Sequence, residues 1–184
     1  MIYPIVAYGH PILKKKAIDI EKDELDVKTL VDDMFETMYN ANGVGLAAPQ
    51  IGKGIRLFVI DTEPIDDNDE AKIKQAFINP EILSEEGEEW AYEEGCLSIP
   101  NIREDVFRQE KIRIRYRDLD WKEHEEDFEG FNARVIQHEY DHIEGVLFTD
   151  HVSAFKKRLL KGKLANISKG KVSADYKMLF PQKK

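Results

Sequence analysis

Apolar positions recur at helical spacing in one part of this chain and alternate with polar positions in another. Residues 25–41 predict an amphipathic helix that ends before Gly43, because their apolar side chains fall on a single stripe. This stripe consists of Leu30, Val31, Met34, Phe35 and Met38. Residues 111–117 alternate Ile or Tyr with basic residues, which is typical of a half-buried strand, and residues 55–61 and 123–128 predict further strands.

Two more helices are predicted toward the end of the chain, over residues 131–144 and 153–164. Strands that precede a buried helix are typical of the α+β class. We therefore expect antiparallel strands packed around a central helix, with further helices at the N- and C-terminal ends. The chain shows no internal repeat or linker, so residues 1–184 are expected to form a single domain that ends in a basic tail at about 165–184.

The predicted helix over residues 131–144 contains the pattern His138-Glu139-x-x-His142, which is typical of a metal site. Residues four apart on a helix share one face, so both imidazoles can bind one ion while Glu139 exchanges protons with a water that the ion activates. Phe131 and Val135 precede the histidines on the same stripe, which is expected to face the core. The pattern favours a hydrolase, and a pair of hydrogen-bonded core histidines is the alternative.

A catalytic site of this kind needs a third protein ligand and one open position. Phe148 stands where the metzincin pattern requires a third histidine, and acidic residues are too scarce after the motif for a carboxylate ligand from a later helix. Cys96, the only cysteine of the chain, is the remaining soft ligand. The nearby Gly95 and Pro100 predict a bent segment around it rather than a regular strand. A buried small hydrophobe is the alternative interpretation of Cys96.

Three segments of the chain together resemble the peptide deformylase family. Its motifs Gly-x-Gly-x-Ala-Ala-x-Gln, Glu-Gly-Cys-Leu-Ser and Gln-His-Glu-x-Asp-His occur here in the family's order, at residues 43–50, 94–98 and 137–142. The resemblance spans most of the chain and is therefore far more specific than any single motif.

The resemblance implies an enzyme that removes the formyl group from the N-formylmethionine at the start of new polypeptides and releases formate. It implies one divalent metal ion held by Cys96, His138 and His142, with Fe²⁺ in the cell and Ni²⁺, Co²⁺ or Zn²⁺ as substitutes. The ligand types alone are compatible with several borderline metals. Glu139 would act first as general base and then as general acid.

Further roles follow from the resemblance. The side-chain amide of Gln50 and the backbone N–H of Leu97 would stabilise the oxyanion, and Gly45 belongs to the motif that contacts substrate. Glycines without Cβ atoms let backbone approach an extended substrate closely. The candidate substrate-binding residues are Gly43, Val44, Glu94, Arg103, Phe131 and Val135. Core packing is the alternative for the two residues on the helix, and solvated surface is the alternative for Arg103.

Charge is distributed unevenly along the chain. The net charge is −9, yet residues 155–184 carry ten Lys or Arg and a single Asp, a local charge of +9. Such a basic end would suit ribosomal RNA, with simple solubility as the alternative. The acidic remainder of the chain argues against general DNA binding. The acidic segment 61–69 contains Pro64 and is expected to form an exposed loop.

We expect a cytoplasmic monomer that does not enter a membrane. No stretch of the sequence is long and apolar enough for a span, residues 1–8 lack the basic start of a secretion signal, and a metal-thiolate site suits a reducing compartment. Three competing hypotheses remain at this stage. They are another small metallopeptidase with the same helix motif, a cysteine hydrolase, and a non-enzymatic ribosome-associated module with a structural metal.

Overall fold

A curved antiparallel sheet forms most of the protein, whose computed structural model describes residues 1–65 and 71–181. The strand order is β2-β3-β4-β5-β6, and every neighbouring pair is antiparallel. These strands are β2 (Gly45–Ala47), β3 (Leu57–Asp61), β4 (Lys74–Cys96), β5 (Ile99–Arg117) and β6 (Glu123–Glu129). A separate pair of short parallel strands joins β1 (Ile5–Val6) to β7 (Met178–Leu179).

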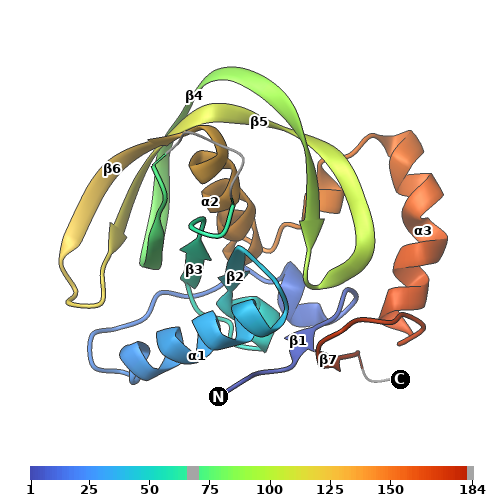
Figure 1. The fold of residues 1–184 in the computed structure, drawn as a ribbon, viewed down its shortest axis with the longest axis horizontal. Coiled ribbons are helices and arrows are strands. Elements are labelled where there is room, and N and C mark those ends of the chain that lie inside the picture. Colours follow the sequence, from blue (N-terminus) through green and yellow to red (C-terminus); the bar gives the residue numbers. More distant parts are fainter. Residues whose placement is uncertain (66–70, 182–184) are drawn as a thin grey trace.

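The helices confirm the predicted α+β class. They are α1 (Val27–Asn40), α2 (Gly130–Ile143) and α3 (Ala154–Ser168), with short 3-10 turns η1 (Pro11–Lys14), η2 (Ala48–Ile51) and η3 (Phe148–Asp150). Helix α2 lies inside the arch of the sheet and packs against β2, β3, β5 and β6 (Figure 1). The α1 and α3 helices lie outside this arch, toward the N- and C-terminal ends (Figure 1).

The β4–β5 hairpin is much longer than the strand predicted over residues 111–117. The middle of β4 is mostly exposed and polar, so no alternating pattern marks it in the sequence. Register shifts between the two strands bend the hairpin over α2. The prediction of a bent segment around Cys96 was partly confirmed. Cys96 is the last residue of β4 and pairs with Ile99 across a turn of two residues, but the strand register shifts between Gly95 and Cys96.

Helix α1 forms as its apolar stripe predicts. Val27, Leu30, Val31, Met34 and Met38 are buried and belong to a cluster with residues of β2 and β3. The side chain of Asp26 accepts a hydrogen bond from the Thr29 N–H at 3.1 Å and so caps the helix start. A cap of this kind contributes about 1 kcal/mol to helix stability.

Helix α2 is buried on nearly all sides, which is unusual for a helix with this many polar residues. Its apolar side chains join Phe58, Phe77 and Ile114 in a cluster beneath the sheet. The helix ends before Gly145, whose φ of +77° is left-handed and whose added Cβ would lie 2.8 Å from the backbone of Lys14. Glycine therefore satisfies both the helix stop and the close approach of η1.

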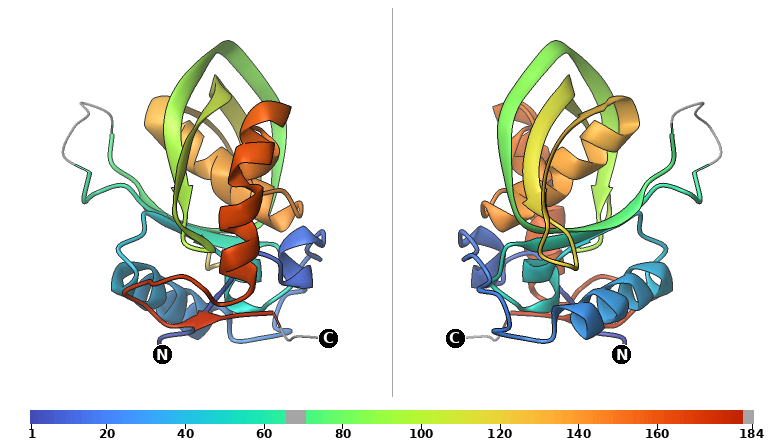
Figure 2. Two further views of the ribbon diagram at one scale, coloured as in Figure 1. Left: turned by 90° about the vertical axis from the view of Figure 1, so that its right-hand side faces the viewer. Right: turned by 90° about the vertical axis from the view of Figure 1, so that its left-hand side faces the viewer.

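The chain returns to its beginning after α3. The pairing of β7 with β1 places Met178 beside Ile5, and the Ile5 N–H donates to the Lys177 carbonyl at 2.8 Å. Figure 2 shows this final segment passing beside the N-terminal strand at the base of the molecule. The expected basic tail at 165–184 thus includes the end of α3 and an ordered strand.

The acidic segment 61–69, expected to form an exposed loop, begins in the buried strand β3. Residues 66–69 of the acidic segment lie outside the described residues, whereas Asp61 is buried in β3 and accepts a hydrogen bond from the Tyr39 hydroxyl.

Within residues 1–65 and 71–181, none of the helices combines the length and apolar character that crossing a bilayer requires.

Candidate active site

Three ligand atoms converge where β4 ends beside α2. The ligand atoms of Cys96, His138 and His142 all lie within 4.8 Å of one another, and the Cys96 Sγ to His142 Nε2 distance is 3.4 Å. Tetrahedral binding of zinc with ordinary bond lengths separates sulfur and nitrogen ligands by about 3.6 Å. The three side chains therefore fit a single divalent ion of this size.

The turn that carries Cys96 is fixed from two other parts of the chain. It contains Leu97 and Ser98, and the Ser98 carbonyl accepts a hydrogen bond from the Tyr8 N–H at 2.9 Å. The Leu97 carbonyl accepts a hydrogen bond from the Tyr176 hydroxyl at 2.7 Å. Both carbonyls of the turn are thus occupied, which holds the thiol in place beside α2.

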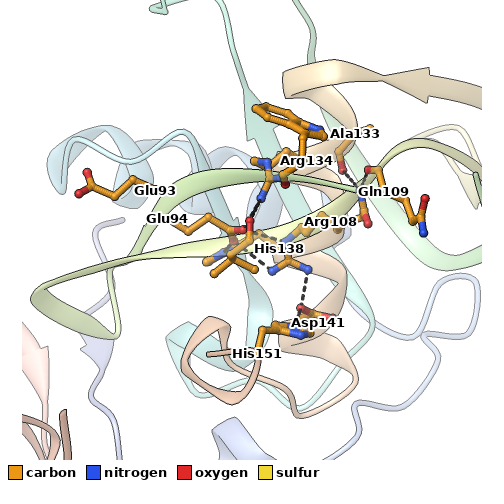
Figure 3. Close-up of polar contacts among 12 residues, drawn as sticks. Glu93, Glu94, Arg108, Gln109, Ala133, Arg134, His138, Asp141 and His151 are labelled. Carbon is orange, nitrogen blue, oxygen red and sulfur yellow. Dashed lines mark hydrogen bonds and ion pairs between the residues drawn. The ribbon is translucent and has the colours of Figure 1, made fainter. Parts of the chain in front are cut away.

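A buried ionic network supports His138 (Figure 3). Glu94 lies 2.7 Å from His138 Nδ1, which leaves Nε2 as the ring nitrogen available to an ion. Both oxygens of Glu94 also accept from Arg108, at 2.8 and 3.0 Å, and one accepts from Arg134 at 2.8 Å. Although burial raises the pKa of Glu94, hydrogen bonds from His138 and Arg108 hold it well below its usual range. Glu94 therefore stays charged and orients His138.

Glu139 is buried beside the ligands. It is 4% exposed, and burial raises its pKa to about 7, so it can both accept and release a proton near neutral pH. Its Oε2 has no hydrogen-bond partner among the described residues. Gly45 contacts the same carboxylate so closely that an added Cβ would lie 2.8 Å from Glu139 Cγ and Cδ. A buried oxygen left unpaired in this way is available to a water or a substrate.

Gln50 faces the ligands from η2. Its Oε1 accepts a hydrogen bond from the Ala47 N–H at 2.9 Å, which settles the amide orientation because a backbone N–H can only donate. Its Nε2 then points to Cys96 Sγ at 3.4 Å and to Ser98 Oγ at 3.3 Å. The residue is 1% exposed, so this donor is held in place by its surroundings.

A cavity of about 750 Å³ opens in front of these groups. Twelve of the thirteen site residues predicted from the sequence line it, and His142 lies beneath them as a buried candidate ligand. Phe131 and Val135 contribute apolar surface from α2, although Val135 is mostly buried in the core. Arg103 lies at the rim, where its exposed side chain pairs with Glu93 at 2.8 Å.

Comparison with known proteins decides the family. Residues 2–158 match the model of the polypeptide deformylase family. The chain belongs to this family. It is 65% identical to a peptide deformylase of Cytophaga hutchinsonii over the full length of both chains, and 58% identical to that of Christiangramia forsetii over 100% of this chain and 98% of the relative.

Solved structures of peptide deformylases share the fold. The structure from Legionella pneumophila is 39% identical and has a TM-score of 0.80. The match covers 92% of this chain and 96% of the Legionella chain. A mutant of peptide deformylase 1B from Arabidopsis thaliana is 33% identical, with a TM-score of 0.82 and 91% coverage of both chains. Peptide deformylases are metal-dependent hydrolases, so the chain is an enzyme and the non-enzymatic hypothesis is excluded.

Several residues of this deformylase site could not be assigned from the sequence. Arg108 also donates to Asp141 at 2.8 Å, and His151 lies 2.7 Å from the same carboxylate oxygen (Figure 3). Arg134 is 2% exposed and stacks 4.2 Å from the Trp90 ring centroid. The one available signal was position, because Arg134 lies one turn before His138 on a stripe expected to be buried.

Proposed function

We propose that this enzyme removes the formyl group from the N-terminal formylmethionine of newly made polypeptides and releases formate. One observation carries the proposal. The unpaired carboxylate oxygen of Glu139 is buried beside three converging candidate metal ligands and the oriented amide of Gln50. A base, a metal site and an oxyanion donor at one place are what hydrolysis of an amide requires.

Cys96, His138 and His142 would hold one divalent ion, which we propose to be Fe²⁺ in the cell, with Ni²⁺, Co²⁺ or Zn²⁺ as substitutes. When bound, the ion supplies Lewis acidity that makes water a stronger acid and the formyl carbonyl a better electrophile. The Cys96 thiolate adds negative charge and so moderates this acidity compared with a third neutral imidazole.

Glu139 moves the proton. As general base its carboxylate takes a proton from the attacking water, and as general acid it returns that proton to the nitrogen of the leaving amine. The formyl C–N bond breaks in this second step, so Glu139 ends in the form in which it began. Its pKa of about 7, raised by burial, matches both tasks near neutral pH.

Gln50 and Leu97 would stabilise the developing oxyanion. The Ala47 N–H fixes the Gln50 amide so that its Nε2 faces the ligand site. The Leu97 N–H has no hydrogen-bond partner among the described residues, although its carbonyl is bound by Tyr176. Donors that are oriented before the reaction stabilise transition-state charge without reorganisation.

The substrate would lie along the edge of the sheet. Strand β2 is an edge strand, and the glycines at 43 and 45 expose backbone to the cavity beside it. We propose that Val44, Phe131 and Val135 surround the methionine side chain. Arg103 at the rim would contact the peptide backbone beyond it.

Formate release from formyl-Met peptides, measured after anaerobic purification with metal analysis of the same sample, tests the proposal. Glu139→Gln should keep its metal and lose about 10²- to 10⁴-fold in kcat, because the amide keeps the shape but cannot act as a base. The exposed Glu88→Gln on β4 is the matched control and should be unaffected. Internal peptide cleavage without formate would instead identify a metallopeptidase, and inactivation by thiol alkylation without chelator sensitivity would identify a cysteine hydrolase.

We also propose that the enzyme is a cytoplasmic monomer whose basic C-terminal end, residues 155–184, contacts ribosomal RNA. Lys157, Arg158, Lys161 and Lys163 are exposed on α3 and form no ion pair within the described residues. Reversal of these four charges to Glu should weaken ribosome co-sedimentation. Co-sedimentation of the unmodified protein should itself fall steeply as salt is added. Activity on short peptides should remain. Equal co-sedimentation of both proteins across the salt series would leave α3 as solvated surface.

A further inference from the structure

The segment 173–176 forms a wall of the active-site cavity from the far end of the chain. Ser173, Ala174, Asp175 and Tyr176 all line the cavity that Glu139, Cys96 and His138 also line. The segment lies beyond residues 2–158, which match the family model, and no motif marks it in the sequence. Segment 173–176 therefore reaches the cavity only because the C-terminal part of the chain folds back against the N-terminal part.

Anchors on both sides hold this segment. At its first residue, the Asn101 side-chain amide donates to the Ser173 carbonyl at 2.9 Å. After it, β7 pairs with β1, with hydrogen bonds from Ile5 N–H to the Lys177 carbonyl at 2.8 Å and from Ala7 N–H to the Leu179 carbonyl at 2.9 Å. A short stretch fixed at both ends is a defined wall of the cavity.

Tyr176 connects this wall to the turn that carries the ligand thiol. Its hydroxyl donates to the Leu97 carbonyl at 2.7 Å, and its half-buried ring packs with the Leu97 side chain against the cluster formed by α1 and the first strands of the sheet. Burial raises the pKa of Tyr176 to about 12, so the hydroxyl remains a hydrogen-bond donor at neutral pH.

Leu97 is held tightly from several directions. A Cβ added at Gly43 would lie 2.9 Å from Leu97 Cδ1, so the leucine side chain rests directly on this glycine. The next carbonyl of the turn is bound by the Tyr8 N–H, and Ser98 Oγ lies 3.3 Å from Gln50 Nε2. Of these contacts, the Tyr176 hydroxyl is the one that binds the Leu97 backbone itself.

We infer that segment 173–176 completes the substrate cleft and that Tyr176 is a positioning residue, which holds Leu97 so that its N–H can serve the oxyanion. The inference rests on the proposed deformylation mechanism for the role of Leu97. The C-terminal part of the chain would thus position the Leu97 N–H relative to the reacting formyl group.

Tyr176→Phe tests the inference, because it removes the hydroxyl and keeps the ring. We expect kcat for formyl-Met peptides to fall about three- to tenfold, the loss typical of one neutral hydrogen bond, with KM changed less than about twofold. Metal content should match the unmodified enzyme. The control is Tyr39→Phe, which removes a partly buried hydroxyl bond to Asp61 outside the cavity and should leave kcat unchanged.

Hydrogen exchange provides a readout that does not depend on activity. Peptides covering residues 96–99 should exchange faster in Tyr176→Phe than in the unmodified protein, and should exchange at the unmodified rate in Tyr39→Phe. Unchanged kcat together with unchanged exchange would overturn the inference. A fall in kcat that tracks loss of metal would also overturn it, since Tyr176 would then support folding of the metal site. Absence of formate release by the unmodified enzyme would refute the proposed function, and the exchange result would still decide whether Tyr176 positions Leu97.

Discussion

Gly45→Ala is the substitution through which the position of the Glu139 carboxylate, the proposed general base, can be tested most directly. The added Cβ would lie 2.8 Å from both Cγ and Cδ of Glu139, and closer still to Oε1. The backbone of Gly45 lies in β2, paired with Ile60, and does not have the positive φ that would exclude alanine. The perturbation is therefore a contact between one methyl group and one carboxylate.

The size of the effect follows from these distances. Ordinary contact begins at about 3.4 Å, so the carboxylate must move by about 0.6 Å or more, within surroundings that leave Glu139 only 4% exposed. Displacement of a reacting group by about 1 Å can cost 10²-fold in rate, and we expect kcat to fall by about that factor. Overpacking of this kind should also lower the free energy of unfolding by about 1–3 kcal/mol.

Steady-state formate release, metal analysis and urea unfolding of the same preparation measure the three consequences. Metal should be retained, because the three atoms nearest to the added Cβ all belong to Glu139 and none to a ligand. The matched control is Gly162→Ala on α3, where an added Cβ meets nothing within 4 Å. That variant should keep full activity and gain about 0.5–1 kcal/mol from helix propensity.

Two results would refute this reasoning. If Gly45→Ala keeps unmodified kcat, the carboxylate can move without loss and its observed position is not the catalytic one. If activity falls only in proportion to metal content, the substitution acts on the ligand site rather than on Glu139. A crystal structure of the variant would show whether the carboxylate has moved.

Three further substitutions can be tested with the same assays. Cys96→Ser should sharply reduce metal retention, because a hydroxyl replaces a thiolate, and normal metal stoichiometry would remove Cys96 from the ligand set. Gln50→Ala should lower kcat about 10²- to 10³-fold with metal still bound, and an unchanged rate at saturating substrate would exclude it as an oxyanion donor. Asp118→Asn tests pH dependence, since hydrogen bonds from His124 and the backbone lower the pKa of Asp118. The stabilisation from Asp118 is present above its unfolded pKa of about 3.9 and is lost as the pH falls. The variant should be less stable at pH 7 by at most about 1 kcal/mol, because both side chains of the pair remain partly accessible to solvent, which screens the interaction. A difference in urea unfolding that does not shrink between about pH 5 and pH 3 would contradict this.

The sequence by itself determined the elements that local pattern controls. The helical spacing in residues 25–41 marks α1 to within two residues, because a helix with one buried face needs apolar residues at that period. The histidine pair and the intervening Glu139 are one local pattern on one helix, so their common face follows from helix geometry alone. The family also follows from the sequence, because its three motifs are short continuous stretches.

Tertiary structure decided what depends on residues distant in the chain. The middle of β4 has no apolar alternation, so only its pairing with β5 reveals it as a strand. The contacts of Arg108 with Glu94, of Tyr176 with Leu97 and of Gly45 with Glu139 join residues that lie 14, 79 and 94 positions apart. A buried charge or a close glycine contact leaves no local signal, because its stability comes from partners that are brought together only when the chain folds.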